Sequence, residues 1–463
     1  MKTESLGITA PHVHPPAEKS VEYLELIYDL IFVYMIGRNN ALLHHTENGY
    51  VTQSMFLAYF VCTLAVIQIW NFTTFYINLY GRNGVRDHVF LFLNMYLLYY
   101  IADGISVGWE STFFQFNIAW MLILVNIGVQ HIIELRHHQQ EAVESRQLRR
   151  KAAILFAEAA LVGVHMAVYN LTGVSIAYVP ILFGILATIL SSNLNSQNPV
   201  DFAHLSERAM LYVVFTFGEM IISIASYFTG AATLRGMYFS AMAFLIVVGL
   251  FLSYGTLYNK IIDRETVTNG TGYMMIHVFL IFALNNISVS LEFMRDETVD
   301  NLQKTVFLAG SFILYFVFMF MTMKYARERC TMHLKTVLIL CGFAVSFLIV
   351  MLAFRELMAV NIAVTVIYIY GIFLLIYQRG KRSSETLEDQ IRRITYYEDI
   401  MQRASDGSPE LLRELADYYS SDDWKRDFAA DEAGLLPRDL KRGVLSEDGI
   451  YNLLEEFDAF PHA

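Results

Sequence analysis

The sequence predicts an all-α fold: a polytopic membrane helix bundle of about twelve transmembrane helices, followed by a small helical cytosolic domain. Three observations carry this prediction. Of the 463 residues, 55% are hydrophobic and only 17% are charged, whereas a soluble chain carries about a quarter charged residues. Long uncharged stretches recur along the chain. Most of the formal net charge of −11 belongs to the residues after Arg379.

The uncharged stretches set the positions of the helices. A bilayer core about 30 Å thick is crossed by roughly 20 apolar residues in a helix, and the turn-like run from Tyr169 to Gly173 divides one longer stretch in two. The spans are expected, in order, at 21–43, 53–79, 88–108, 113–135, 152–170, 174–194, 207–229, 236–260, 273–292, 304–324, 335–355 and 357–378. Similar features in spans 1 and 7, and in spans 2 and 8, suggest a parallel repeat of six plus six helices.

The basic residues predict the orientation. With a cytosolic N-terminus, the inner segments carry nineteen Lys and Arg, among them Lys151 and Arg208, while the outer loops carry four. Cytosolic loops are enriched in Lys and Arg, so we expect a multi-pass protein of the cell membrane with both termini in the cytosol. Residues 1–20 are polar and lack a signal-peptide cleavage pattern; we expect a disordered cytosolic segment there.

The acidic tail is predicted to be a separate domain. Residues 1–379 hold 22 Lys and Arg against 24 Asp and Glu, and residues 380–463 hold 11 against 20. Apolar residues recur at helical spacing from Leu387 to Met401, and the sequence from Ser408 to Glu410 has the signals of a helix start. We therefore expect a transmembrane domain at 21–378 and an acidic helical domain at 384–460.

Several classes of function are excluded. A nearly neutral body has no basic face for nucleic acid, and three separated cysteines do not form a zinc site or a disulfide framework. The histidine pairs in the loops lack further ligands at metal-binding spacing. Neither a phosphate-binding loop nor a G-x-S-x-G motif is present. We expect no metal and no cofactor.

Charged residues inside the spans are the candidate site. An ionised side chain in the middle of a bilayer costs about 3 kcal/mol or more, so each needs a partner, water or a proton. Glu25 and Asp29 share one face of span 1, and Glu219 lies about 18 Å into span 7. The further candidates for a proton, ion or substrate pathway are His277, Asn285, Glu292, Glu158 and Asp103.

These residues predict a polar cavity open to the cytosol. Glu25, Asp29, Glu219 and His277 are expected to line it, because carboxylates and histidine are the groups that proton relays and cation sites use. The polar and aromatic residues expected at its cytosolic end are Trp70, Tyr76, Asn78 and Arg82. At the same position, the aromatic residues also fit an ordinary interfacial belt.

Several motifs resemble the low-temperature-requirement A (LtrA) family of bacterial membrane proteins. The run ELIYDLIFVY at 25–34 is similar to its opening signature, and Glu207-Arg208 followed by VVFTFGE at 213–219 is similar to its second motif. The elements W-x(5)-Y-x-N from Trp70 and Y-x(3)-H from Tyr273 add to the resemblance, which covers about 20–378. The loop at 79–84 departs from it, because the paired acids of the family are missing. The resemblance implies a polytopic membrane protein linked by its name to growth in the cold.

The tail resembles a second family. Residues 416–449 are similar to a small bacterial domain family with no assigned function, which implies a domain and no activity.

Three hypotheses of function follow. The first is a secondary transporter or proton-linked permease that uses the buried carboxylates to move an unknown small molecule or ion. The second is an enzyme of the membrane acting on a lipid or isoprenoid-linked substrate, with Arg82 and Arg86 holding its head group; an enzyme is the less favoured alternative. The third is a sensor or scaffold whose tail binds a cytosolic protein. In each case the lipid bilayer is a partner and nucleic acid is not.

Overall fold

The computed structural model describes residues 19, 21–105, 109–138, 142–195, 200–228, 233–294, 296–327, 334–383, 387–404, 407–432, 435–437 and 439–457. Contacts between residues divide the chain after Arg379 into two compact units, which are described separately. Apart from Lys19, the segment 1–20 that was expected to be disordered lies outside the described residues.

Twelve α-helices of the first unit occupy the positions of the twelve predicted spans. They are α1 (Tyr23–Asn40), α2 (Gln53–Tyr80), α3 (Val85–Gly104), α4 (Trp109–Leu135), α5 (Ala142–Thr172), α6 (Tyr178–Asn195), α7 (Phe202–Ile224), α8 (Leu234–Thr256), α9 (Thr271–Phe293), α10 (Asn301–Met321), α11 (Leu334–Ala353) and α12 (Met358–Ser383). The all-α fold class is thereby confirmed.

Short elements extend or join these helices. A short antiparallel hairpin follows the helix η1 (Ala41–His44). Its strands, β1 (Thr46–Glu47) and β2 (Tyr50–Val51), have two residues each. A π-helical turn, η3 (Leu257–Ile261), continues α8. The remaining pieces are η2 (Ala225–Phe228) after α7 and η4 (Thr322–Tyr325) after α10.

Local sequence signals set the ends of the helices. Asp201 precedes α7, and its side chain accepts a hydrogen bond from the backbone N–H of His204 at 3.0 Å. Asp300 caps α10 in the same way, since a carboxylate there satisfies N–H groups that have no partner within the helix. Helix α5 ends at Thr172, and Gly173 follows with φ +70°. The break expected between Tyr169 and Gly173 lies there.

The first unit has the composition of a polytopic membrane domain. In the part of the chain that the structure describes, eight helices are long and apolar enough to cross a membrane. Helices α1 and α7 fall short because each carries three charged residues. The number of twelve spans therefore stays a prediction.

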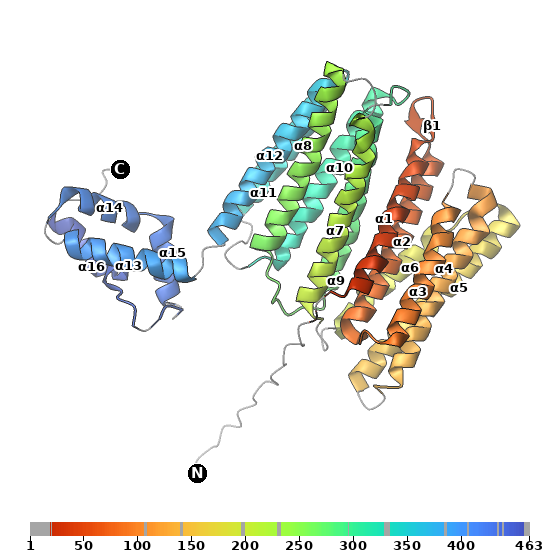
Figure 1. The fold of residues 1–463 in the computed structure, drawn as a ribbon, viewed down its shortest axis with the longest axis horizontal. Coiled ribbons are helices and arrows are strands. Elements are labelled where there is room, and N and C mark those ends of the chain that lie inside the picture. Colours follow the sequence, from red (N-terminus) through yellow and green to blue (C-terminus); the bar gives the residue numbers. More distant parts are fainter. Residues whose placement is uncertain are drawn as a thin grey trace, which may run out of the picture. The chain divides into compact units, whose positions relative to one another are not determined.

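The helices form two neighbouring groups, α1–α6 and α7–α12 (Figure 1). In the first half α1 packs on α2 and α3, and α3 packs on α4; in the second, α7 packs on α8 and α9, and α9 packs on α10. This correspondence fits the predicted parallel repeat. The halves meet where α1 and α2 contact α7 and α9. Most of α2 and α9 is buried, whereas little of α11 is.

The second unit is a small helical domain with its own core. Its elements are α13 (Leu387–Ala404), α14 (Pro409–Tyr419), α15 (Asp422–Glu432), η6 (Gly443–Leu445) and α16 (Glu447–Glu456). Arg393 binds both carboxylate oxygens of the buried Asp427, at 2.8 and 2.5 Å, and Tyr418 donates to the same carboxylate. Burial raises the pKa of Tyr418, so its hydroxyl stays a donor.

Candidate functional site: a charge cluster between the two halves

The centre of the site is an ion pair that joins the two halves. Asp29 on α1 and Arg208 on α7 are both fully buried, and Asp29 Oδ1 lies 2.5 Å from Arg208 Nη2. The indole Nε1 of Trp70 on α2 donates to the same oxygen at 2.8 Å. Removing two charges from water is costly unless they are paired and hydrogen-bonded. The two ions are paired and Asp29 Oδ1 is hydrogen-bonded, whereas Asp29 Oδ2 and Arg208 Nε have no hydrogen-bond partner among the described residues.

Glu25 adds a second carboxylate to the same guanidinium. Its Oε2 lies 3.2 Å from Arg208 Nη1 and 3.3 Å from His204 Nε2. Glu25 lies one helical turn before Asp29 on α1, and His204 lies one turn before Arg208 on α7, so the two pairs meet in register. We call Glu25, Asp29, His204 and Arg208 the buried charge cluster.

Asn78 determines the tautomer of His204. Its Oδ1 accepts the backbone N–H of Asp201 at 3.1 Å, and its Nδ2 donates to the backbone oxygen of Asp201 at 2.8 Å. The amide nitrogen therefore also faces His204 Nδ1, at 3.0 Å. An imidazole nitrogen that accepts a hydrogen bond carries no proton. His204 is accordingly neutral, with its proton on Nε2, toward Glu25.

Lys19 and Asp201 close the end of the cluster. The ammonium of Lys19 donates to the backbone oxygens of Ile77, Asn78 and Gly81 at 2.9–3.1 Å. It thereby caps the C-terminal end of α2. Its backbone N–H donates to Asp201 at 2.9 Å. Burial lowers the pKa of Lys19, while nearby carboxylates oppose this shift. Its charge offsets that of Asp201.

The charges of the buried charge cluster do not balance. Glu25 and Asp29 supply two carboxylates, Arg208 supplies one guanidinium, and the imidazole of His204 is neutral. The cluster holds one negative charge in excess unless one carboxyl group carries a proton. Of these two carboxyl groups, Glu25 borders a cleft, whereas Asp29 is fully enclosed.

The cleft has a volume of about 350 Å³ and lies at the predicted cytosolic end. Seven of its eleven lining residues are charged or polar. The residues that line it are Lys19, Glu22, Leu24, Glu25, Ile77, Gly81, Arg82, Asn83, Asp87, His88 and Leu91. It therefore combines room for a small solute with charges of both signs, and Glu25 links it to the buried charge cluster.

A second group of charges lies beside the cleft. The fully buried carboxylate of Glu134 on α4 binds Arg82 at 3.1 Å, Arg86 at 2.6 Å and His138 at 3.2 Å. The hydroxyl of Tyr76 lies 3.4 Å from Arg86 Nη2. Arg82 also lines the cleft. Of the predicted cytosolic-end residues, Arg82 therefore binds Glu134 and Tyr76 lies against Arg86, another partner of Glu134. Glu134 itself was not predicted from the sequence.

His277 lies apart from the buried charge cluster. Its Nδ1 donates to the backbone oxygen of Tyr273, one turn earlier on α9, at 2.9 Å. Its Nε2 accepts from the hydroxyl of Tyr254 on α8 at 3.0 Å. Both ring nitrogens are satisfied by neighbours within the second half. The structure does not place His277 on the cleft beside Glu25.

Glu219 and Glu292 lie toward the predicted outer end. Glu219 follows Arg208 by eleven residues on α7, which is about 16 Å of helix, and it packs against Gly37 of α1, where a Cβ would lie 2.6 Å from its Oε1. Glu292 at the end of α9 forms an ion pair with His44 of η1. These contacts also join the halves, but far from Glu25.

The remaining candidates are separate from one another. Glu158 on α5 is fully buried, and Gln68 of α2 lies 3.5 Å from its Oε2. Asn285 is buried on α9, and its Oδ1 has no hydrogen-bond partner among the described residues. Asp103 accepts from Gln115 at 3.0 Å near the end of α3. None of the three borders the cleft.

Arg208 and His204 are the site residues that sequence reasoning missed. The charge pattern assigned Arg208 to the cytosolic edge, although it follows Glu207 in the motif of span 7. One signal was available: Glu25 and Asp29 require a cation, and Arg38, nine residues after Asp29 on the same helix, lies on the opposite side of that helix. The choice among the other basic residues depends on how α1 packs on α7.

The fold and the site define a polytopic helical membrane protein whose two halves are joined by buried charges. The chain belongs to the LtrA family: the model of the bacterial low temperature requirement A protein matches residues 20–370. The model of a domain of unknown function (DUF4298) matches residues 384–460. Both resemblances predicted from the motifs are confirmed. No curated protein and no solved structure matches the chain significantly.

Proposed function

We propose that the chain is a secondary transporter, a permease that couples the passage of a small solute or ion to a proton. The observation that carries the proposal is the buried charge cluster, which lies between two six-helix halves and borders a cleft through Glu25. Ionisable groups within a membrane domain mark ion and substrate pathways. Transporters with two repeats place these sites where the repeats meet.

Polar contacts between the halves lie in two layers, as alternating access requires. The buried charge cluster forms the layer at the predicted cytosolic end. Near the other end, His44 pairs with Glu292, and the hydroxyl of Tyr59 donates to Asn286 at 2.8 Å. Opening one layer while the other stays closed would expose the interior to one side of the membrane at a time.

Glu25 is the residue to which we assign the coupled proton. A proton on Glu25 removes the excess negative charge of the cluster and leaves Arg208 with the carboxylate of Asp29 alone. The contact between α1 and α7 then weakens at this end, because one of its two ion pairs is lost. Protonation from the cleft would in this way favour opening of the inner layer.

The enzyme hypothesis receives less support. It relied on Arg82 and Arg86 to hold the head group of a lipid, and both guanidinium groups bind the buried carboxylate of Glu134. A head group would have to compete with an ion pair already in place.

The proposal is tested with purified protein in liposomes that contain a pH-sensitive dye. Pools of small polar solutes (amino acids, sugars, nucleosides and organic acids) are added outside in turn. We expect one pool to produce a pH change that protein-free liposomes lack, and Glu25→Gln to abolish it. Glu356→Gln is the matched control, because that carboxylate side chain is 69% exposed. If no pool moves protons, or Glu25→Gln transports like the parent protein, the proposal fails.

A further inference from the structure

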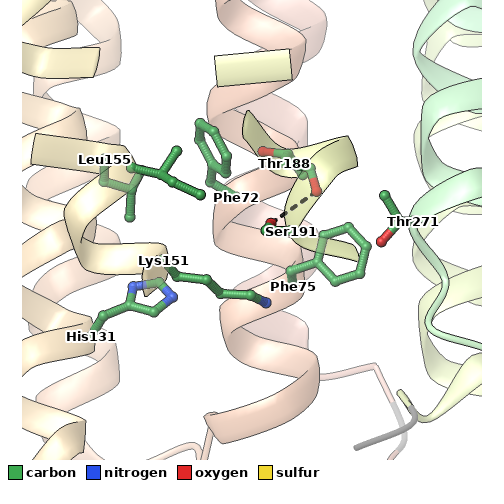
Figure 2. Close-up of a pocket in the computed structure, with 9 residues that line it drawn as sticks. Phe72, Phe75, His131, Lys151, Leu155, Thr188, Ser191 and Thr271 are labelled. Carbon is green, nitrogen blue, oxygen red and sulfur yellow. Dashed lines mark hydrogen bonds between the residues drawn. The ribbon is translucent and has the colours of Figure 1, made fainter. Parts of the chain in front are cut away.

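A small cavity encloses the side chain of Lys151 between the two halves. Figure 2 shows Lys151 of α5 pointing between the helices toward the ring of Phe75. The cavity is lined by Phe72, Phe75, His131, Lys151, Ile154, Leu155, Thr188, Ser191 and Thr271. Its volume is about 30 Å³, which is enough for one water molecule or one small ion.

Lys151 brings a positive charge into this cavity without a carboxylate to balance it. Among the described residues, its ammonium forms no ion pair. The Nζ atom lies over the ring of Phe75, 5.2 Å from the ring centroid. Arg208 and Arg86, in contrast, each bind a buried carboxylate. A partly buried cation whose only partner is an aromatic ring lacks full compensation.

Thr271 at the N-terminus of α9 brings a second polar group to the cavity. Thr271 is the first residue of α9 and is buried, and its hydroxyl has no hydrogen-bond partner in the described part of the chain. The N-terminus of a helix attracts negative charge, because its first N–H groups and the helix dipole point there. Ser191 also lines the cavity, but its hydroxyl donates to the backbone oxygen of Thr188 at 2.9 Å (Figure 2).

His131 does not supply the missing negative charge. Its Nδ1 lies 2.9 Å from the backbone oxygen of Ile127, to which it donates, so Nδ1 carries a proton and the ring is not an anion. In the part of the chain that the structure describes, no Asp or Glu lines the cavity. An ammonium, an unpartnered hydroxyl and a helix N-terminus thus converge on a space the size of one small ion.

We propose that this cavity binds a single monovalent anion of the size of chloride, held by Lys151 and Thr271 at the N-terminus of α9. The volume of the cavity excludes organic anions such as gluconate. Because Lys151 belongs to the first half and Thr271 to the second, the bound anion links the halves beside the buried charge cluster. The proposal is independent of transport, since the anion acts as a structural ligand.

The first test measures thermal unfolding of the full chain in detergent at constant ionic strength. Replacing sodium gluconate with sodium chloride is expected to raise the midpoint by about 2 °C, because a ligand that binds only the folded state stabilises it. Lys151→Met should abolish this shift. Lys260→Met is the matched control, since its ammonium also lies over an aromatic ring, that of Tyr377 at 4.9 Å, but does not line this cavity.

The second test measures binding itself, in case Lys151→Met fails to fold. Equilibrium dialysis with radioactive chloride is expected to find about one bound ion per chain, and Thr271→Val should weaken its affinity several-fold. If the parent protein binds no chloride and its unfolding does not respond to the anion, the proposal is overturned. A Lys151 side chain carried as a neutral amine would give that result.

Discussion

The contributions of Asp29 and Arg208 to the free energy of unfolding are expected to be strongly coupled. Asp29→Asn or Arg208→Met should each destabilise the protein by about 3–5 kcal/mol, because one buried charge loses its partner. The double variant should lose less than the sum of the two. Thermal and denaturant unfolding in detergent measure all three.

The exposed pair Arg355–Glu356 provides the control for this double-mutant cycle. Its atoms lie 3.2 Å apart, but its side chains are 50% and 69% exposed, so Arg355→Met should change stability by less than about 1 kcal/mol. Equal effects at Arg208 and Arg355 would show that the buried pair does not have the role assigned to it.

Single residues also show how far the sequence determined the candidate site. The spacing of Glu25 and Asp29 predicted a shared helix face and the need for a partner. It did not identify Arg208, because a basic residue at the start of a span has the same composition as one at the membrane surface. The position of His277 was likewise undetermined, since its partner Tyr254 comes from a different helix.

At the scale of elements, the segment after α1 is expected to make stability depend on pH. The hydrogen bond with Glu292 raises the pKa of His44 above 6.5, and burial opposes this; Asp296 adds a further negative charge nearby. A raised pKa means that the stabilisation is fully present below pH 6.5 and is lost as pH rises through the folded-state value.

Unfolding temperatures measured across this range should therefore fall with increasing pH. The effect should not exceed about 1 kcal/mol, because the His44 side chain is 38% exposed and is screened by solvent. His44→Gln should remove this part of the dependence. A variant with an unchanged pH profile would contradict the assignment to His44.

The start of α9 depends on a glycine. Gly270 has φ +68°, and a Cβ there would lie 2.3 Å from Leu205 Cδ2 of α7. Gly270→Ala should destabilise the protein by about 1–2 kcal/mol for the left-handed backbone alone. Gly310→Ala in α10, where a Cβ would contact nothing, should instead stabilise slightly. Thermal unfolding compares the two, and equal effects would be inconsistent with this account.

The sequence predicted the helices better than their membrane character. Every predicted span contains a helix, because apolar runs of the right length have few other structures available in a bilayer. Helices α1 and α7 combine a helical pattern with the charges of the site, so composition alone does not establish them as spans. Their charged residues are explained only by the contact between these two helices.

At the scale of the whole molecule, the tail has a core of its own. Residues that include Ile394, Leu415, Trp424 and Ile450 are buried together within the second unit. We expect deletion of 384–463 to leave the unfolding temperature of the membrane unit unchanged, because a domain with a separate core can fold alone. A large loss of stability would contradict this independence. Loss of cellular function with stability retained would instead support the sensor hypothesis.

The two halves themselves were suggested by weak similarity between spans 1 and 7. Their helices make corresponding contacts, but the side chains that join them are different on each side. Trp70 of α2 donates to Asp29 on α1, while Tyr254 of α8 donates to His277 on α9. The helix contacts of the two halves therefore correspond as the sequence similarity predicted, whereas the polar side-chain contacts do not.

The hydrogen bond from Trp70 to Asp29 gives the protein an optical reporter at its own centre. The chain has four tryptophans, and the indole of Trp70 is fully buried against the buried charge cluster. In a variant with the other three replaced by phenylalanine, its fluorescence would shift to longer wavelength when α1 and α7 separate and water enters. A solute that opens the inner layer could thus be detected by a shift in the emission maximum of Trp70, even when the solute has not been identified.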